Sequence, residues 1–116
     1  MKKDLFSLNG KVVVITGAAG LLGCQHADAV ASFGGSPVLL DLDKVLLEDQ
    51  AIELNAKYGV DAVSYVVDIT SEKEVEQNCK DVVGRYGKID ALVNNAANNP
   101  KIENSDTKNF SRLENF

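Results

Sequence analysis

Short apolar segments rich in Val, Ile and Leu alternate along this chain with longer segments in which apolar residues recur at helical spacing. The short segments are typical of strands buried on both faces of a parallel sheet, and the longer ones of helices with one apolar face. The predicted strands are residues 11–16, 38–40, 62–67 and 89–93, and the predicted helices are 21–33, 44–58 and a third between Ser71 and Gly87.

This alternation predicts an α/β fold with an open parallel sheet between two layers of helices. Right-handed crossovers give the strand order 3-2-1-4, with the first two helices on one face and the third on the other. We expect a ligand crevice at the carboxyl ends of the first and fourth strands, where the order reverses. Residues 98–116 are polar, Asn-rich and without periodicity. The predicted organisation is therefore one domain over 1–97 and a polar loop or tail over 98–116.

Two of the predicted helices carry a stripe of apolar residues. In the second helix the stripe consists of Leu47, Ala51, Leu54 and Tyr58. In the third it consists of Val75, Cys79, Val82, Val83 and Tyr86. Ser71 followed by Glu74 is a capping-box signature for the start of the third helix.

The composition is that of an ordinary globular protein, with 45% hydrophobic and 25% charged residues. A net charge of −5 without a Lys or Arg cluster argues against nucleic acid and membranes as partners. The N-terminus lacks a signal-peptide core, and no apolar run reaches the roughly 20 residues of a membrane span. Cys24 and Cys79 lie in different predicted helices, and His26 has no second ligand nearby. We therefore expect a cytoplasmic protein without a disulfide or metal site, with Cys24 a small packed residue.

The first predicted strand is followed by Gly17, Gly20 and Gly23 and then by a helix. Such a turn binds pyrophosphate, because the N–H groups and the dipole at a helix N-terminus favour anionic oxygens. Gly17 would allow the sharp turn, Gly20 the close approach of phosphate, and Gly23 close packing of helix on strand. The spacing G-x-x-G-x-x-G differs from the standard fingerprint, so a tight turn without a ligand is the alternative.

Asp41 ends the second predicted strand, about 20 residues beyond the glycine turn, where a carboxylate binds the 2′-hydroxyl of an adenosine ribose. The alternative is a helix N-cap, a role that Asp43 could serve equally well. Leu42 follows Asp41, and no Arg or Lys adjoins it. A 2′-phosphate about 4 Å away would be repelled by about 4 kcal/mol per unit charge at an effective dielectric near 20. The sequence therefore predicts NAD rather than NADP as cofactor.

Four motifs together resemble the short-chain dehydrogenase/reductase family. They are T-G-A-A-G-L-L-G at 16–23, the strand-end Asp41, D-I-T at 68–70 and N-N-A-A at 94–97. The resemblance extends to about residue 100 and implies a Rossmann-type fold. It implies an NAD-dependent oxidoreductase that transfers hydride between NAD(H) and a small alcohol or carbonyl substrate.

The resemblance also implies roles for individual residues. The Asp68 side chain would hydrogen-bond the adenine amino group and the Ile69 N–H the adenine ring, while Asn95 and Ala96 would line the adenosine ribose and the crevice. Gly17, Gly20, Leu22 and Gly23 would contact the pyrophosphate. From the residues alone, Asp68 could instead cap the third helix, and Asn94 could stabilise a turn.

Two positions depart from the family's single-domain branch, which usually has T-G-x-x-x-G-x-G and N-N-A-G. Here Leu21 and Ala97 replace glycines. T-G-x-x-G-x-x-G is the pattern of the extended branch, which includes sugar-nucleotide epimerases and dehydratases. The motifs D-I-T and N-N-A-A favour the single-domain branch, and the extended branch stays as an alternative.

The family's acid–base chemistry resembles that of a Tyr assisted by a Lys four residues later, since a free phenol has a pKa near 10. None of Tyr58, Tyr65 and Tyr86 has a Lys at that position, so no catalytic residue is predicted. We expect the cofactor half of a longer, homo-oligomeric enzyme, truncated after the fourth strand. A stand-alone nucleotide-binding or interaction module is a third reading.

Overall fold

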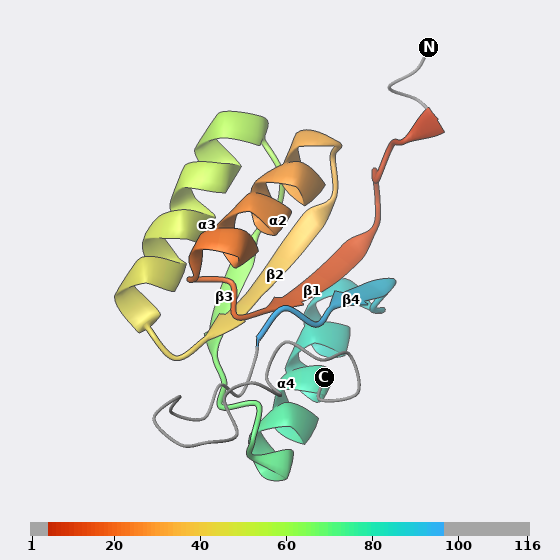
Figure 1. Cartoon of the computed structure of the whole chain (residues 1–116). Helices are drawn as coiled ribbons and strands as arrows, with labels where there is room; N and C mark the ends of the chain where they lie inside the picture. The colour runs from red at the N-terminus through yellow and green to blue at the C-terminus, as the bar shows by residue number, and fades with distance from the viewer. Residues whose placement is uncertain (1–4, 97–116) are drawn as a thin grey trace, which may run out of the picture.

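The computed structural model describes residues 5–96, in which strands and helices alternate (Figure 1). Ala97 and the predicted polar tail lie outside the described residues. The elements are β1 (Val12–Thr16), α2 (Leu21–Ser32), β2 (Ser36–Asp41), α3 (Lys44–Tyr58), β3 (Val63–Val66), α4 (Glu72–Tyr86) and β4 (Ala91–Val93). All seven predicted elements are present, with ends that differ by at most about two residues.

The four strands form one sheet in the order β3-β2-β1-β4, as predicted, and every neighbouring pair is parallel. β1 lies inside the sheet, where Val14 is opposite Val38 of β2 and Leu92 of β4. All five residues of β1 are buried, which is why its first four residues are continuously apolar rather than alternating.

Helices cover both faces of the sheet, α2 and α3 on one face and α4 on the other (Figure 1). Successive side chains of β1 point to opposite faces. Val13 and Ile15 belong to the core cluster that includes residues of α2 and α3, whereas Val12 and Val14 belong to the cluster that includes Val82 of α4. The predicted assignment of the helices to the two faces is therefore confirmed.

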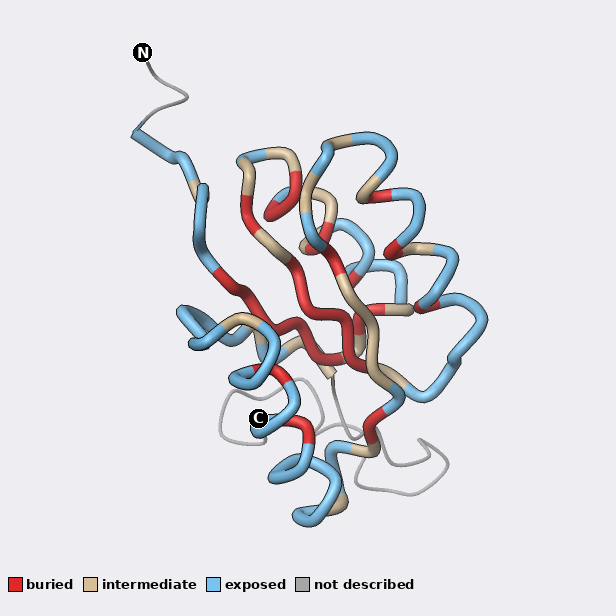
Figure 2. The backbone as a smooth tube through the Cα atoms, turned by 180° about the vertical axis from the view of Figure 1, so that it is seen from behind, coloured by how far each residue is buried: buried red, intermediate tan, exposed pale blue. Residues whose placement is uncertain are grey.

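The two predicted helix stripes have different outcomes. Leu47, Ala51 and Leu54 of α3 are buried, as expected. On α4 the buried residues are Asn78 and Val82, whereas Cys79 is exposed and Val75 and Val83 are each 43% exposed. The apolar stripe of α4 is therefore only partly covered: Val82 is buried and Tyr86 packs against the same cluster, whereas most of the helix is exposed (Figure 2).

Side chains cap α3 and α4 at their first turns. The Asp43 carboxylate accepts a hydrogen bond from the Leu46 N–H at 3.1 Å, and the Ser71 hydroxyl accepts one from the Glu74 N–H at 3.3 Å. The Glu74 carboxylate accepts from the Asp68 N–H at 3.1 Å, so it joins the preceding loop to the helix. None of the helices within residues 5–96 has the length and apolarity needed to cross a membrane.

Thr16, the last residue of β1, joins this strand to the segment after β4. Its hydroxyl oxygen accepts a hydrogen bond from the Ala96 N–H at 3.0 Å. The same hydroxyl lies 3.4 Å from two acceptors, the Val93 carbonyl and the Asn94 side-chain oxygen, and can donate to either. Thr16 is buried, so these bonds hold the ends of β1 and β4 together at the edge where the crevice was expected.

We predict that Thr16→Val destabilises the chain by about 1–3 kcal/mol, because the partly buried Ala96 N–H loses its acceptor. Valine keeps the branched shape, so the hydroxyl is what changes. Thr16→Ser keeps the hydroxyl and is the matched control. Amide hydrogen exchange should be faster at Ala96 in the valine variant than in the serine variant, and equal exchange in the two would contradict the role assigned to the hydroxyl.

β4 is an edge strand, since its one strand neighbour among the described residues is β1. Ala91 is exposed and Leu92 is 61% exposed, so the edge presents both unpaired backbone groups and apolar surface. Edges of this kind pair with further strands, including those of other copies.

We predict that this 116-residue chain self-associates at micromolar concentration and that Leu92→Lys shifts it toward monomer, because a charged side chain opposes edge pairing. Ile52→Lys makes the same change at a residue of α3 that is 68% exposed and serves as the control. Analytical ultracentrifugation measures both variants. A parent chain that sediments as a monomer, with strong amide protection over Ala91–Val93, would contradict the open edge.

Candidate functional site

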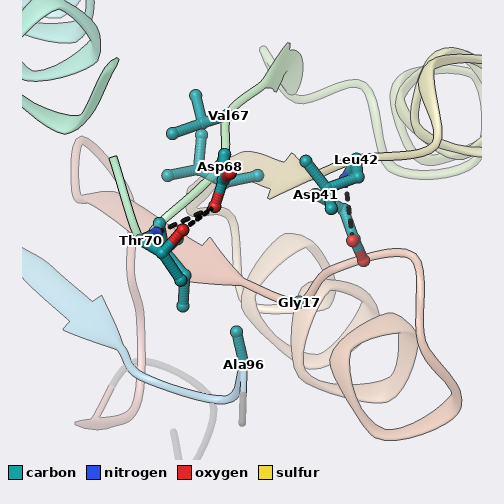
Figure 3. A pocket seen from close by; sticks show the side chains of 9 residues that line it. Gly17, Asp41, Leu42, Val67, Asp68, Thr70 and Ala96 are labelled. Atoms are coloured by element: carbon teal, nitrogen blue, oxygen red, sulfur yellow. Dashed lines mark hydrogen bonds between the residues drawn. The ribbon is translucent and has the colours of Figure 1, made fainter. Parts of the chain in front are cut away.

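A cavity of about 220 Å³ opens at the carboxyl edge of the sheet (Figure 3). It lies where the predicted crevice was expected, between the ends of β1, β2, β3 and β4. Its lining residues are Gly17, Leu40, Asp41, Leu42, Val67, Asp68, Ile69, Thr70 and Ala96. Four segments that are far apart in the sequence, one after each strand, therefore meet around one space.

At two positions, Gly17 and Gly23, the fold requires glycine because a side chain would collide with neighbouring backbone. Gly17 has a φ of 66°, and a Cβ there would lie 3.0 Å from the Ala96 Cα. A Cβ at Gly23 would collide with the Gly17 carbonyl oxygen and lie 2.8 Å from the Ala18 Cα, so α2 packs directly on the turn. The close packing expected at Gly23 is present, against the loop that follows β1.

Gly20 differs from the other two glycines of the turn. Its backbone is extended, with φ −76° and ψ 169°, and a Cβ would meet only the Gly17 oxygen, at 3.4 Å. The protein therefore has room for a side chain at this position. The predicted role of Gly20, contact with phosphate, stays a prediction that these distances leave open.

The start of α2 lacks the side-chain cap found at α3 and α4. Gly20 is its N-cap residue and makes no side-chain hydrogen bond, and the first turn contains no acidic residue. The first N–H groups of a helix have no partners within it, and here no cap residue occupies them. Leu21 and Leu22, the first two residues of α2, are exposed, so solvent and an anion can reach the N-terminus of this helix.

Asp41 is not the cap of α3, because Asp43 performs that role. One oxygen of the Asp41 carboxylate accepts from the Ala19 N–H at 2.9 Å, and the other accepts from the Leu42 N–H at 2.8 Å. The carboxylate lies at the rim of the cavity, and each oxygen has a second lone pair that a ribose hydroxyl could use.

Asp68 also leaves the capping of its helix to another residue, Ser71. Its carboxylate accepts from the Thr70 hydroxyl at 2.6 Å and from the Thr70 N–H at 2.9 Å (Figure 3). These two hydrogen bonds hold the pKa of the Asp68 carboxyl below its usual value, so the group is ionised at neutral pH. Ile69, between Asp68 and Thr70 in the sequence, also lines the cavity.

Asn95 and Ala96 follow β4, and only Ala96 lines the cavity. The Asn95 amide donates to the Gly17 carbonyl at 3.2 Å, and its backbone N–H donates to the Val93 carbonyl at 3.0 Å. Ala96 lines the cavity, whereas the side chain of Asn95 is committed to the glycine turn. The structure thus places Asn95 behind the crevice and Ala96 in its wall.

Sequence reasoning missed several residues of this site and misjudged one near it. Thr70, which orients Asp68, could have been found from its place in D-I-T, whereas the apolar wall formed by Leu40, Leu42 and Val67 has no distinguishing pattern. Cys24, expected to be packed, is exposed. Within residues 5–96 no three His, Cys, Asp or Glu side chains are grouped in a way that could hold a metal ion.

Comparison with known proteins agrees with this geometry. The model of the short chain dehydrogenase family matches residues 11–115. Among curated proteins, the NADP-dependent mannitol dehydrogenase of Aureobasidium melanogenum is 38% identical over 96 residues, which are 80% of this chain and 36% of that protein.

Two solved structures are similarly related. NAD+-bound xylitol dehydrogenase superposes with a TM-score of 0.74 and 42% identity, over 78% of this chain and 34% of that one. NADPH-dependent 3-quinuclidinone reductase from Rhodotorula rubra has a TM-score of 0.74 and 34% identity, over 79% of this chain and 35% of that one. The chain thus spans about a third of the length of the relatives it matches. With the family model matched over nearly all of its residues, and with the sheet order and the glycine turn described above, this chain belongs to the short-chain dehydrogenase family.

Proposed function

We propose that this chain is the cofactor-binding part of an NAD-dependent oxidoreductase that transfers hydride between NAD(H) and a small alcohol or carbonyl compound. The observation that carries the proposal is the convergence of the glycine turn, Asp41 and Asp68 on one cavity. The related proteins named above are dehydrogenases and a reductase, which favours oxidoreductase chemistry over the epimerases and dehydratases of the extended branch.

The residues present fit the adenosine part of the cofactor. The cavity of about 220 Å³ is below the range of about 300–1,000 Å³ typical of pockets that enclose a whole drug-sized ligand. We assign Asp68 and Ile69 to the adenine, Asp41 to the ribose hydroxyls, and Ala96 to the wall beside the ribose. When bound, the nicotinamide ring would supply the hydride or accept it.

We assign the pyrophosphate to the glycine turn and the first turn of α2. Gly17 and Gly23 keep the turn compact, and Gly20 and Leu22 lie where the uncapped N–H groups begin. Because the first turn of α2 carries no acidic side chain of its own, its N–H groups and the helix dipole can act on the phosphates. Asn95 contributes indirectly, by holding the Gly17 carbonyl.

The relatives include both an NAD+ complex and NADP(H)-dependent enzymes, so the preference of this chain depends on its own residues. Asp41 is half-buried at the rim of the cavity and places a carboxylate where a 2′-phosphate would lie in our assignment. The repulsion, about 4 kcal/mol per unit charge at about 4 Å and a dielectric near 20, favours NAD.

Chemistry requires groups that these 116 residues do not contain. No Tyr is followed by Lys four residues later, so the chain has no candidate for the general acid and base. We propose that the complete enzyme is a homo-oligomer in the cytoplasm and that residues outside this chain supply catalysis and substrate contacts. The thiols of Cys24 and Cys79 are free, as in proteins of reducing compartments.

The chain should bind NAD+ at least about 10-fold more tightly than NADP+, a difference of about 1.4 kcal/mol, because of the Asp41 carboxylate. Calorimetric titration of both nucleotides measures the ratio. Asp41→Asn should bring the two affinities closer together, and any general damage to the site cancels in the ratio. Equal or tighter binding of NADP+ by the parent chain would contradict the assignment.

The chain alone should not transfer hydride, because it lacks the Tyr and Lys pair. The assay follows NADH absorbance with a panel of mannitol, xylitol and simple secondary alcohols, and a full-length relative serves as the positive control. Turnover that stays with the chain through successive purification steps would contradict this prediction. Binding of NAD+ without turnover supports the division of labour that we propose.

A further inference from the structure

The turn between β1 and α2 has little of its own to hold it in place. Its residues, Gly17, Ala18, Ala19 and Gly20, carry no polar side chain. The start of α2 lacks the cap that fixes α3 and α4. The position of this turn therefore depends on hydrogen bonds from neighbouring elements.

Two consecutive N–H groups of the turn donate to the end of β2. The Ala18 N–H donates to the Leu40 carbonyl at 3.0 Å, and the Ala19 N–H donates to the Asp41 carboxylate at 2.9 Å. The first bond joins two backbones and continues the pattern of the sheet. The second depends on a side chain, and Ala19 immediately precedes the N-cap residue of α2.

This arrangement has a consequence for anion binding. A Ser or Asp at the N-cap would fix the helix start by accepting from the N–H groups of its first turn, and would thereby occupy donors that a phosphate needs. Asp41 instead holds the N–H one residue before the cap. The helix start is fixed, and the donors of the first turn stay available.

We propose that Asp41 is a positioning residue for the phosphate-binding turn, in addition to its assigned contact with the ribose. Through Ala19 it sets the direction in which the first N–H groups of α2 point. Its carboxylate can serve both functions, because each oxygen now accepts one hydrogen bond and has a lone pair left. Replacing Asp41 to change cofactor preference would therefore also loosen the turn.

The test compares Asp41→Ala with Asp41→Asn. Both remove the negative charge, but asparagine keeps an oxygen that can accept from the Ala19 N–H. The probe is 2′,3′-dideoxy-ADP, which carries phosphates but no ribose hydroxyl for residue 41 to bind. We expect the alanine variant to bind this probe about 2- to 10-fold more weakly than the asparagine variant, the effect of one hydrogen bond.

Amide hydrogen exchange, measured without nucleotide, gives a second readout. The binding comparison rests on the proposed function, whereas the exchange measurement does not. Exchange at Ala19 should be faster in Asp41→Ala than in Asp41→Asn, while Ala18, bonded to the Leu40 backbone, keeps its protection. Asp43→Ala removes a carboxylate two residues away, from the cap of α3, and should leave Ala19 unchanged. If Asp41→Ala does not fold, Asp41→Leu keeps the branched shape without an acceptor and makes the same comparison.

Equal exchange at Ala19 in the two variants, or equal affinity for the dideoxy probe, overturns the positioning role. Failure of the parent chain to bind ADP or NAD+ at all would overturn the proposed function instead. In that case the exchange comparison still decides whether Asp41 holds the turn.

Discussion

The carbonyl group of Gly17 is the point at which the separate parts of this domain meet. It accepts hydrogen bonds from the Gly20 N–H at 3.1 Å and from the Asn95 amide at 3.2 Å, and α2 packs against it at Gly23. A side chain at Gly17 or Gly23 would push these parts away from one another. The crevice therefore exists because two glycines let a helix, a turn and the end of β4 approach one strand end.

The three helices of the described residues differ in how their first turns are capped. Ordinary capping would satisfy the start of every helix, and α3 and α4 follow that rule with Asp43 and Ser71. The exception is α2, whose N-cap residue, Gly20, makes no side-chain hydrogen bond to the first turn. The two helix starts that need no ligand are satisfied by their own sequence, and the one proposed to hold phosphate is not.

Much of the architecture could be predicted from the sequence because the relevant forces are local. Continuous apolar runs such as residues 12–15 identify strands that are buried on both faces, and glycines such as Gly59 and Gly87 end the helices. On α4 the sequence identifies a stripe of apolar residues, but Val75 and Val83 within it are each 43% exposed. Whether such a stripe is covered depends on which surfaces lie opposite, and the sequence of the helix does not contain that information.

The candidate site divides in the same way between sequence and structure. Sequence alone determined the sheet order, the glycine turn and the two carboxylates at strand ends, since each follows from residue type and spacing. Tertiary structure decided how Asp41 and Asn95 are used: Asp41 accepts from the Ala19 N–H of the glycine turn rather than capping α3, and the Asn95 side-chain amide donates to the Gly17 carbonyl. The bonds of Asp68 to Thr70 are local and lie within the D-I-T motif. A polar side chain at a strand end can bond to several groups, some of them close in the sequence and some on other loops. For Asp41 and Asn95 the partner belongs to another loop, so the choice is made only when strands about 20 or more residues apart bring their ends together.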